Sequence, residues 1–161
     1  MFEEHSTTIL QIFKDRDLLT AEQCQEISEE KDRTGKSAAD LVIDFGILDR
    51  DRVLQTVADY LGMEYVNIDV AEEEFPEDII KLIPGASARL HGIVPLAVTG
   101  NLLKLAIRDP FNSNAAQEIS FILNKDVEVL VADPEKIDNF VSSHYKETRK
   151  DDDLQRIATF H

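Results

Sequence analysis

The sequence contains a single cysteine, Cys24. One thiol cannot form a disulfide within the chain, which excludes the class of small secreted domains that disulfides hold together. No stretch approaches the ~20 consecutive apolar residues that a membrane-spanning helix needs, and the N-terminal residues lack the apolar segment of a signal peptide. We therefore expect a soluble cytoplasmic protein without a membrane span of its own.

Basic residues are scarce: 17 lysines and arginines stand against 32 acidic residues, for a formal charge of −15. This balance argues against binding nucleic acid polymers or anionic membranes through the surface as a whole. It favours a basic partner instead. With 161 residues and 43% hydrophobic content, the chain can form one domain or two small ones.

Recognisable catalytic or metal-binding patterns are also missing. The histidines show none of the spacings typical of metal sites; they are His5, His91, His144 and His161. Cys24 shares a predicted helical face with Ile27, so we assign it to the core. The acidic clusters lack the turn glycine and alternating oxygen ligands of a calcium loop. We expect no metal and no cofactor.

Gly35-Lys36-Ser37 resembles the end of a phosphate-binding P-loop. That motif needs a glycine five positions before Gly35, where the chain has Glu30, and a preceding strand, whereas 21–31 has a helical pattern. We interpret the triplet as a turn between helices. With no Walker segment, the chain is predicted not to hydrolyse ATP and not to be an enzyme.

Residues 1–62 have a helical pattern throughout. Thr20, with Gln23 three positions later, and Asp49 are predicted to cap two helices, and the two caps are 29 residues apart. The same offset relates further residues, which predicts a duplicated helix pair. These matches are Ile12 with Leu41, Phe13 with Val42, Asp15 with Asp44, Asp17 with Gly46, and Cys24 with Val53.

A β-hairpin is predicted around Gly100-Asn101, which separates two apolar runs. With this loop, the apolar partners share one face and the other face is only half covered. The expected pairs are Thr99 with Leu102, Val98 with Leu103, Leu96 with Leu105, and Val94 with Ile107. The half-covered face carries Pro95, Ala97, Lys104 and Ala106.

Strands and helices alternate around this hairpin, in the order β-α-β-β-α-β-α. We expect a strand at Tyr65–Ile68, an acidic turn at 71–74 and a helix at 77–82 closed by Pro84-Gly85. After the hairpin we expect a helix capped by Asn112 or Ser113, a strand at 127–131, and a helix that Asp133-Pro134 begins. The apolar positions of these two helices are Ile119, Ile122 and Leu123, then Ile137, Phe140, Val141 and His144.

The predicted fold class is therefore α+β. A helical subdomain, 1–62, precedes a small α/β subdomain, 63–146, with a three- to four-stranded sheet and two to three helices. Residues 147–161 are highly charged, and we interpret them as a linker or tail.

Ten short segments follow one another in a fixed order over about residues 7–146. They are Leu19-Thr20-x-Glu22, Gly35, Leu41-Val42, Phe45-Gly46-Ile47-Leu48, Tyr60-Leu61-Gly62-Met63, Leu82-Ile83-Pro84, Ala88-Arg89, Ile93-Val94-Pro95-Leu96, Leu105-Ala106-Ile107-x-Asp109-Pro110 and His144-Tyr145. In this order and spacing they resemble the N-terminal, MshEN-like domain of the GspE family of type II secretion and type IV pilus assembly ATPases.

The resemblance implies a non-catalytic docking or regulatory domain. In the family, this domain precedes the hexameric motor and links it to the cytoplasmic part of an inner-membrane platform protein, or adjusts the motor in response to a signal. The expected partner is therefore that platform protein, and the resemblance implies a cytoplasmic position, peripheral at the inner membrane face.

The resemblance also implies an alternative function, because some family members bind cyclic-di-GMP through tandem arginine-leucine-glycine motifs. The positions of those three residues hold Thr8-Ile9-Leu10 and Ser37-Ala38-Ala39 here, and Asp17 replaces a glycine. The candidate ligand residues that remain are Arg33, Gly35, Gly46 and Leu48. Basic side chains that could hold phosphate are Lys14, Arg16, Lys31, Arg33 and Lys36.

Overall fold

The computed structural model describes residues 1–71 and 76–145. The chain divides into two compact units, Met1–Tyr65 and Val66–His161. The boundary expected from the sequence, after residue 62, lies three residues before this division. The acidic turn expected at 71–74 falls almost wholly outside the described residues, and so does the segment 147–161.

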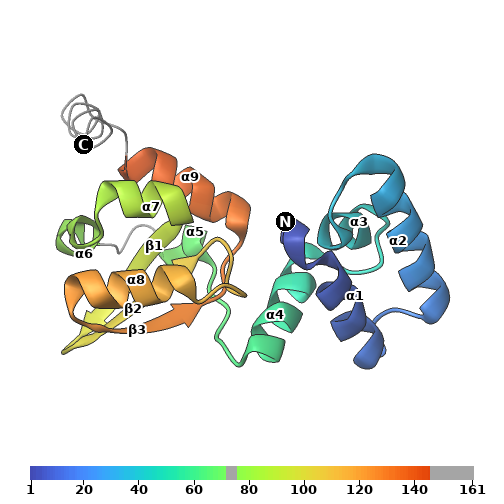
Figure 1. Cartoon of the computed structure of the whole chain (residues 1–161), viewed down its shortest axis with the longest axis horizontal. Helices are drawn as coiled ribbons and strands as arrows, with labels where there is room; N and C mark the ends of the chain where they lie inside the picture. The colour runs from blue at the N-terminus through green and yellow to red at the C-terminus, as the bar shows by residue number, and fades with distance from the viewer. Residues whose placement is uncertain (72–75, 146–161) are drawn as a thin grey trace. The chain divides into compact units, whose positions relative to one another are not determined.

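The first unit is helical (Figure 1). Thr20 begins its second long helix with a capping box: Gln23 N–H donates to Thr20 Oγ1 at 3.1 Å, and Thr20 N–H donates to Gln23 Oε1 at 2.9 Å. Asp49 Oδ1 accepts from the N–H of Arg52 at 2.7 Å. Both predicted caps are confirmed. The elements are η1 (Glu3–His5), α1 (Ser6–Asp15), α2 (Ala21–Thr34), α3 (Ala38–Asp44) and α4 (Arg50–Leu61).

The two halves of this unit make the same backbone hydrogen bonds at an offset of 29 residues. After α1, Leu18 N–H donates to the carbonyl of Phe13 at 2.8 Å; after α3, Ile47 N–H donates to the carbonyl of Val42 at 3.1 Å. The predicted duplication of a helix pair is therefore confirmed in structure. The copies differ in length, since α2 has 14 residues and α4 has 12.

The turns after α1 and α3 both need a left-handed residue. Asp17 has φ 58° and Gly46 has φ 71°. Glycine adopts this conformation without a steric penalty, whereas a residue with a Cβ pays roughly 1–2 kcal/mol. The first copy therefore keeps the turn of the second copy at an energetic cost.

The core of the first unit lies between these four helices. Side chains from both copies fill it, and each is at most 5% exposed. They are Ile9, Ile12, Phe13, Leu19, Ile27, Ala38, Ala39, Leu41, Val42, Val53, Leu54, Val57 and Ala58.

The second unit is an α/β layer structure (Figure 1). Its sheet has the order β1-β2-β3, with β1 antiparallel and β3 parallel to β2. Among the described residues, the sheet has three strands, which fits the predicted fold class, and five helices accompany it where two to three were expected. The elements are α5 (Ile68–Ala71), α6 (Glu77–Leu82), α7 (Gly85–His91), β1 (Ile93–Thr99), β2 (Leu102–Ile107), α8 (Asn114–Leu123), β3 (Asp126–Leu130) and α9 (Pro134–His144).

The hairpin forms around Gly100-Asn101 as predicted, but its register changes part of the way along. Thr99 pairs with Leu102 and Val98 with Leu103, as expected. A bulge between Pro95 and Ala97 then shifts the pairing by one residue. Proline has no N–H to donate to the ladder, so a bulge beside it is physically reasonable. The pairs expected for Leu96 and Val94 are wrong: Pro95 pairs with Leu105, Val94 with Ala106, and Ile93 with Ile107.

The expectation of a half-covered second face holds for Ala97 and Lys104, which are half-buried, but is wrong for Pro95 and Ala106. Pro95 is buried. In β2, the consecutive residues Leu105, Ala106 and Ile107 are each at most 2% exposed. Because neighbouring side chains point to opposite faces of a sheet, both faces of β2 are covered at this end.

Three further expectations need correction. Tyr65–Ile68 is not a strand: Tyr65 forms an isolated bridge and Ile68 begins α5, where Asn67 Oδ1 accepts from Asp69 N–H at 3.1 Å. Pro84-Gly85 begins α7 rather than only closing α6, because proline favours the start of a helix. In α8, Ile119 is buried but Ile122 is 48% exposed.

The last helix follows the prediction closely. Asp133 Oδ1 accepts from Glu135 N–H at 3.0 Å, and Pro134 occupies the first turn. The predicted apolar residues Ile137, Phe140 and Val141 are at most 6% exposed. His144 is exposed, with its ring 4.1 Å from that of Phe140.

Tyr145 connects the end of α9 to two other helices. Its hydroxyl donates to the carbonyl of Ile80 at 2.5 Å, and its carbonyl accepts from Arg89 Nη1 at 3.1 Å. Burial raises the pKa of the Tyr145 phenol above its ordinary value of 10.0. The phenol therefore stays protonated in the fold at pH values where an unfolded chain would lose the proton.

We predict that Tyr145→Phe lowers the free energy of unfolding by about 1–2 kcal/mol, because the Ile80 carbonyl loses its donor. Since folding raises the pKa of Tyr145, its contribution to the free energy of unfolding is fully present below pH 10. This contribution declines as the pH rises above 10. Urea unfolding at pH 7 and pH 10.5 checks both statements. Tyr60→Phe is the matched control, since Tyr60 is 50% exposed; equal losses in the two variants would contradict the prediction.

A candidate ligand groove between two helices

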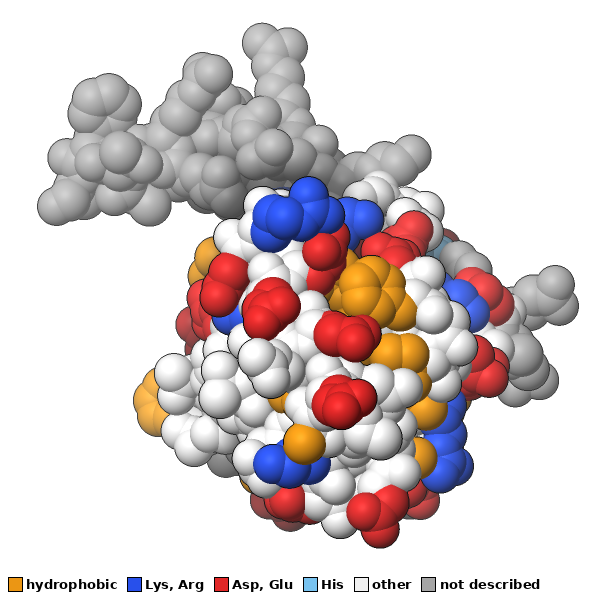
Figure 2. Space-filling view, turned by 90° about the vertical axis from the view of Figure 1, so that its right-hand side faces the viewer, with side chains coloured by type: hydrophobic (Ala, Val, Ile, Leu, Met, Phe, Trp, Pro, Cys, Tyr) orange, Lys and Arg blue, Asp and Glu red, His pale blue; other side chains and the backbone are white. Residues whose placement is uncertain are grey.

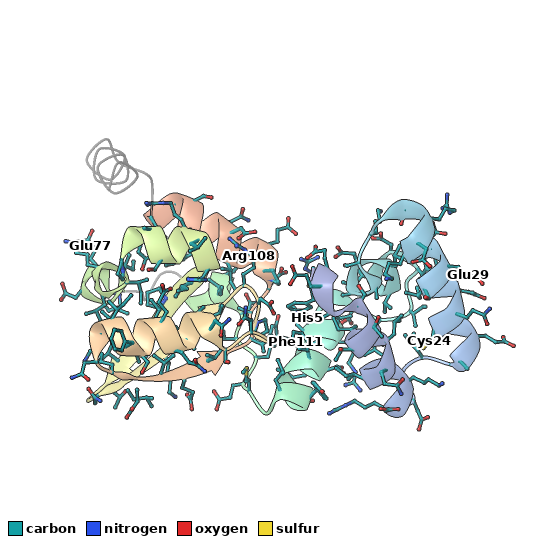
Figure 3. All side chains as sticks on the ribbon, in the orientation of Figure 1. His5, Cys24, Glu29, Glu77, Arg108 and Phe111 are labelled. Carbon is teal, nitrogen blue, oxygen red and sulfur yellow. The ribbon has the colours of Figure 1, made fainter. Side chains whose placement is uncertain are left out.

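A groove of about 280 Å³ lies between α1 and α2, and we call it the α1–α2 groove. Its lining residues recur every three or four positions on each helix, which places them on the facing sides. Figure 3 labels Cys24 on α2 at this side. The lining consists of Thr7, Leu10, Gln11 and Lys14 from α1 with Cys24, Gln25, Ser28 and Lys31 from α2.

The groove combines positive charge with neutral hydrogen-bonding groups. Lys14 has no carboxylate partner within the described residues, and Lys31 Nζ lies 3.9 Å from Asp32 Oδ1. The amides of Gln11 and Gln25 donate to carboxylates of their own helices, at 2.7 and 3.3 Å. In a chain of charge −15, two lysines in one groove offer a local site for an anion.

Cys24 is not the core residue that the sequence predicted. It is only partly buried, because it lies beside the groove, and its thiol is 3.8 Å from the carbonyl oxygen of Leu10. Burial raises the pKa of the Cys24 thiol above its ordinary value of 9.0, and the charge of Lys14 opposes this rise.

We predict that Cys24 reacts with thiol reagents in the native protein, but more slowly at pH 7 than in the unfolded chain. Only the thiolate reacts, and the raised pKa leaves less of it at neutral pH. The rate should keep increasing with pH beyond 9.0, the ordinary pKa. Lys14→Gln should slow the reaction further. Labelling at pH 7 as fast as in denaturant would contradict this prediction.

The residues predicted for cyclic-di-GMP lie outside the lining of this groove. Gly35 ends α2 with φ 76°, and Arg33 pairs there with Glu30. Gly46 lies beyond the far end of α3, in the turn before Leu48, with φ 71°. Arg33 and Gly35 therefore precede α3, whereas Gly46 and Leu48 follow it. Because α3 has seven residues, at about 1.5 Å each, roughly 10 Å of helix separates the first pair from the second. Their role in binding stays a prediction.

The five basic candidates are also separated by the fold. The α1–α2 groove brings together Lys14 and Lys31. Lys36 Nζ forms an ion pair with Asp44 at 3.1 Å, and Arg33 pairs with Glu30 as above. Arg16 caps the end of α1. The helical spacing of residues 7, 10, 11 and 14 could have indicated the groove, but the partner face on α2 depends on how the helices pack.

Gly35-Lys36-Ser37 forms the predicted turn between helices. Ser37 is 3% exposed and its Oγ accepts from Asp40 N–H at 3.2 Å, capping α3. The amino group of Met1 also approaches Ser37 Oγ, at 3.4 Å, and Asp40 Oδ2, at 2.9 Å. Ser37 therefore has a structural role in which its side chain is enclosed.

The histidines occupy separate structural positions. His91 ends α7, and its Nε2 lies 2.6 Å from Glu118 Oε2 on α8, so the pair links these two helices. His5 ends η1 and His144 ends α9. His161 lies outside the described residues.

Within residues 1–71 and 76–145, no helix has the length and apolar composition needed to cross a bilayer.

Comparison with known proteins identifies the family. A family profile described as the MshEN domain matches residues 61–151. The chain is 25% identical over 130 residues to the type IV pilus assembly ATPase PilB of Myxococcus xanthus, a match that covers 81% of this chain and 23% of that protein. The chain thus corresponds to less than a quarter of the length of this relative.

Two solved structures share the fold. The structure of MshE with cdg has a TM-score of 0.71 at 19% identity and covers 85% of this chain and 98% of that one. The N-terminal domain of XpsE has a TM-score of 0.57 at 17% identity and covers 87% of this chain and 94% of that one. The resemblance inferred from the sequence is confirmed, and the chain belongs to the MshEN domain family.

Proposed function

We propose that this chain is a non-catalytic docking and regulatory domain of a type IV pilus assembly or type II secretion ATPase. It links the motor to the cytoplasmic part of an inner-membrane platform protein, which places it in the cytoplasm at the membrane face. The observation that carries the proposal is the MshEN match, together with the likeness to PilB of Myxococcus xanthus.

The surface chemistry supports a protein partner. Figure 2 shows acidic side chains spread over the side of the first unit that carries α2, with apolar side chains between them. Such a surface attracts a basic partner at long range and repels nucleic acid. The charge of −15 points in the same direction.

The altered pKa values support a non-catalytic role. Among the described residues, they belong to groups with structural contacts. Burial lowers the pKa of the Met1 amino group, but the hydrogen bonds to Asp40 and Glu3 and the charges of these carboxylates together raise it by more. The pKa of Tyr145 is raised by burial between helices, and that of Cys24 by burial beside the groove. None of these groups forms a nucleophile-base pair of the kind that catalysis needs.

Co-elution with the platform protein tests this proposal. The purified chain and the purified cytoplasmic segment of the platform protein from the same organism are mixed and separated by size-exclusion chromatography. We expect one complex at 50 mM salt that weakens at 500 mM salt, because screening shortens the reach of the acidic surface. Separate elution at both salt concentrations would contradict the docking function.

As an alternative, we propose that the first unit is a cyclic-di-GMP receptor. The α1–α2 groove favours this candidate, because Lys14 and Lys31 could hold phosphate there. In calorimetry, cyclic-di-GMP should then bind at about micromolar Kd. Lys14→Gln should weaken binding about tenfold, and Lys81→Gln should not, since Lys81 lies in the second unit and is 75% exposed. The absence of any heat would rule the alternative out.

A further inference from the structure

An exposed aromatic side chain stands beside the outer edge of the sheet. Phe121, on α8, is 89% exposed, the largest exposed fraction among the large apolar side chains of the described residues. It lines an open trough of about 520 Å³, which we call the α8–β3 trough. The trough is bounded by Ala116, Gln117, Ser120 and Phe121 from α8 and by Asp126 and Val127 from β3.

The outer edge of β3 can accept another strand. The sheet order places β3 at one edge, as Figure 1 shows beside α8. In the part of the chain that the structure describes, β3 pairs only with β2. Val66 N–H donates to the carbonyl of Val131 at 2.9 Å, but that contact lies beyond the end of the strand. An open edge presents backbone N–H and C=O groups that a partner strand can pair with.

The acidic side chains of β3 beside the trough favour a basic partner. Asp126 is exposed and has no salt-bridge partner among the described residues, whereas exposed Glu128 pairs with Lys104 at 3.5 Å. A second copy of this chain would bring the same acidic strand and another charge of −15 to the edge. Like charges opposite one another are destabilising, so self-pairing is disfavoured. A basic segment, by contrast, neutralises Asp126.

We propose that the α8–β3 trough is where the platform protein docks, by adding an extended basic segment to the edge of β3. An apolar side chain of that segment packs between Phe121 and Val127, while a basic neighbour pairs with Asp126. This inference rests on the proposed docking function and assigns a surface to it. Docking at the α8–β3 trough does not depend on ligand binding in the α1–α2 groove.

The test uses the purified cytoplasmic segment of the platform protein as the probe, titrated into the whole chain. Phe121→Ser should weaken binding at least tenfold, because an aromatic residue at the centre of an interface carries much of the affinity. Since Phe121 is 89% exposed, the variant should keep the native fold. Phe45→Ser is the matched control, since Phe45 is 47% exposed in the first unit, and we expect it to bind like the wild type.

Hydrogen exchange gives a second readout. Backbone amides of β3 should exchange at least tenfold more slowly in the complex, because edge strand pairing protects them. Binding of the probe with Phe121→Ser unchanged and β3 unprotected would overturn the inference and leave the docking function standing. No binding by the wild type would overturn both. Self-association that Phe121→Ser abolishes would show that the occupant is a second copy, against the proposal.

Discussion

Replacing Gly92 by alanine is expected to lower the free energy of unfolding of the second unit by about 2–5 kcal/mol. Gly92 ends α7 in a left-handed conformation, φ 67°, which costs a residue with a Cβ roughly 1–2 kcal/mol. An added Cβ would also lie 2.8 Å from Cβ of Arg108, and such overlap in a packed site costs roughly 1–3 kcal/mol.

Arg108 cannot move away freely. Its backbone N–H donates to the carbonyl of Gly92 at 2.9 Å, and its Nη2 lies 2.6 Å from Asp138 Oδ1. Gly100→Ala is the control, since Gly100 has φ 60° but no atom within 4 Å of the added Cβ. The free energy of unfolding of Gly100→Ala should fall by only about 1–2 kcal/mol, the conformational cost alone. Denaturant unfolding measures both variants. If Gly92→Ala and Gly100→Ala lowered the free energy of unfolding equally, the role assigned to Arg108 would be contradicted.

The second large effect is expected from Phe140→Ala, with a loss of about 3–5 kcal/mol. Phe140 is 2% exposed and belongs to the core between the sheet and its helices. Its removal leaves a cavity that the surrounding strands fill only in part. Phe121→Ala changes the same residue type in the same unit at 89% exposure, and should cost less than about 0.5 kcal/mol.

Thermal unfolding followed through amide signals of β1 and β2 measures both variants, because these strands belong to the second unit. The signals of α1–α4 serve as an internal reference for the first unit. A similar loss in Phe140→Ala and Phe121→Ala would contradict the placement of the core.

Features that depend on neighbours in the sequence were predictable. The caps at Thr20 and Asp49 involve a residue three positions later, and the hairpin loop involves two adjacent residues. The duplication was visible because the caps Thr20 and Asp49 and several apolar positions recur at an offset of 29. For the caps and the hairpin, the physical cause lies within one turn of helix or one loop.

Features that depend on distant packing were not predictable in the same way. Cys24 shares a helix with buried Ile27, but the groove that leaves it partly exposed depends on the position of α1. Ala106 looks like a surface residue in an alternating pattern, yet it is buried because both faces of β2 are covered. Pro95 was the available signal for the bulge, since it cannot donate a hydrogen bond.

The docking function is tested most directly by calorimetric titration of the whole chain with the purified cytoplasmic segment of the platform protein. We predict saturable binding at about micromolar Kd or tighter, weakened by salt and by Phe121→Ser. The absence of binding to that segment at low salt would contradict the docking function.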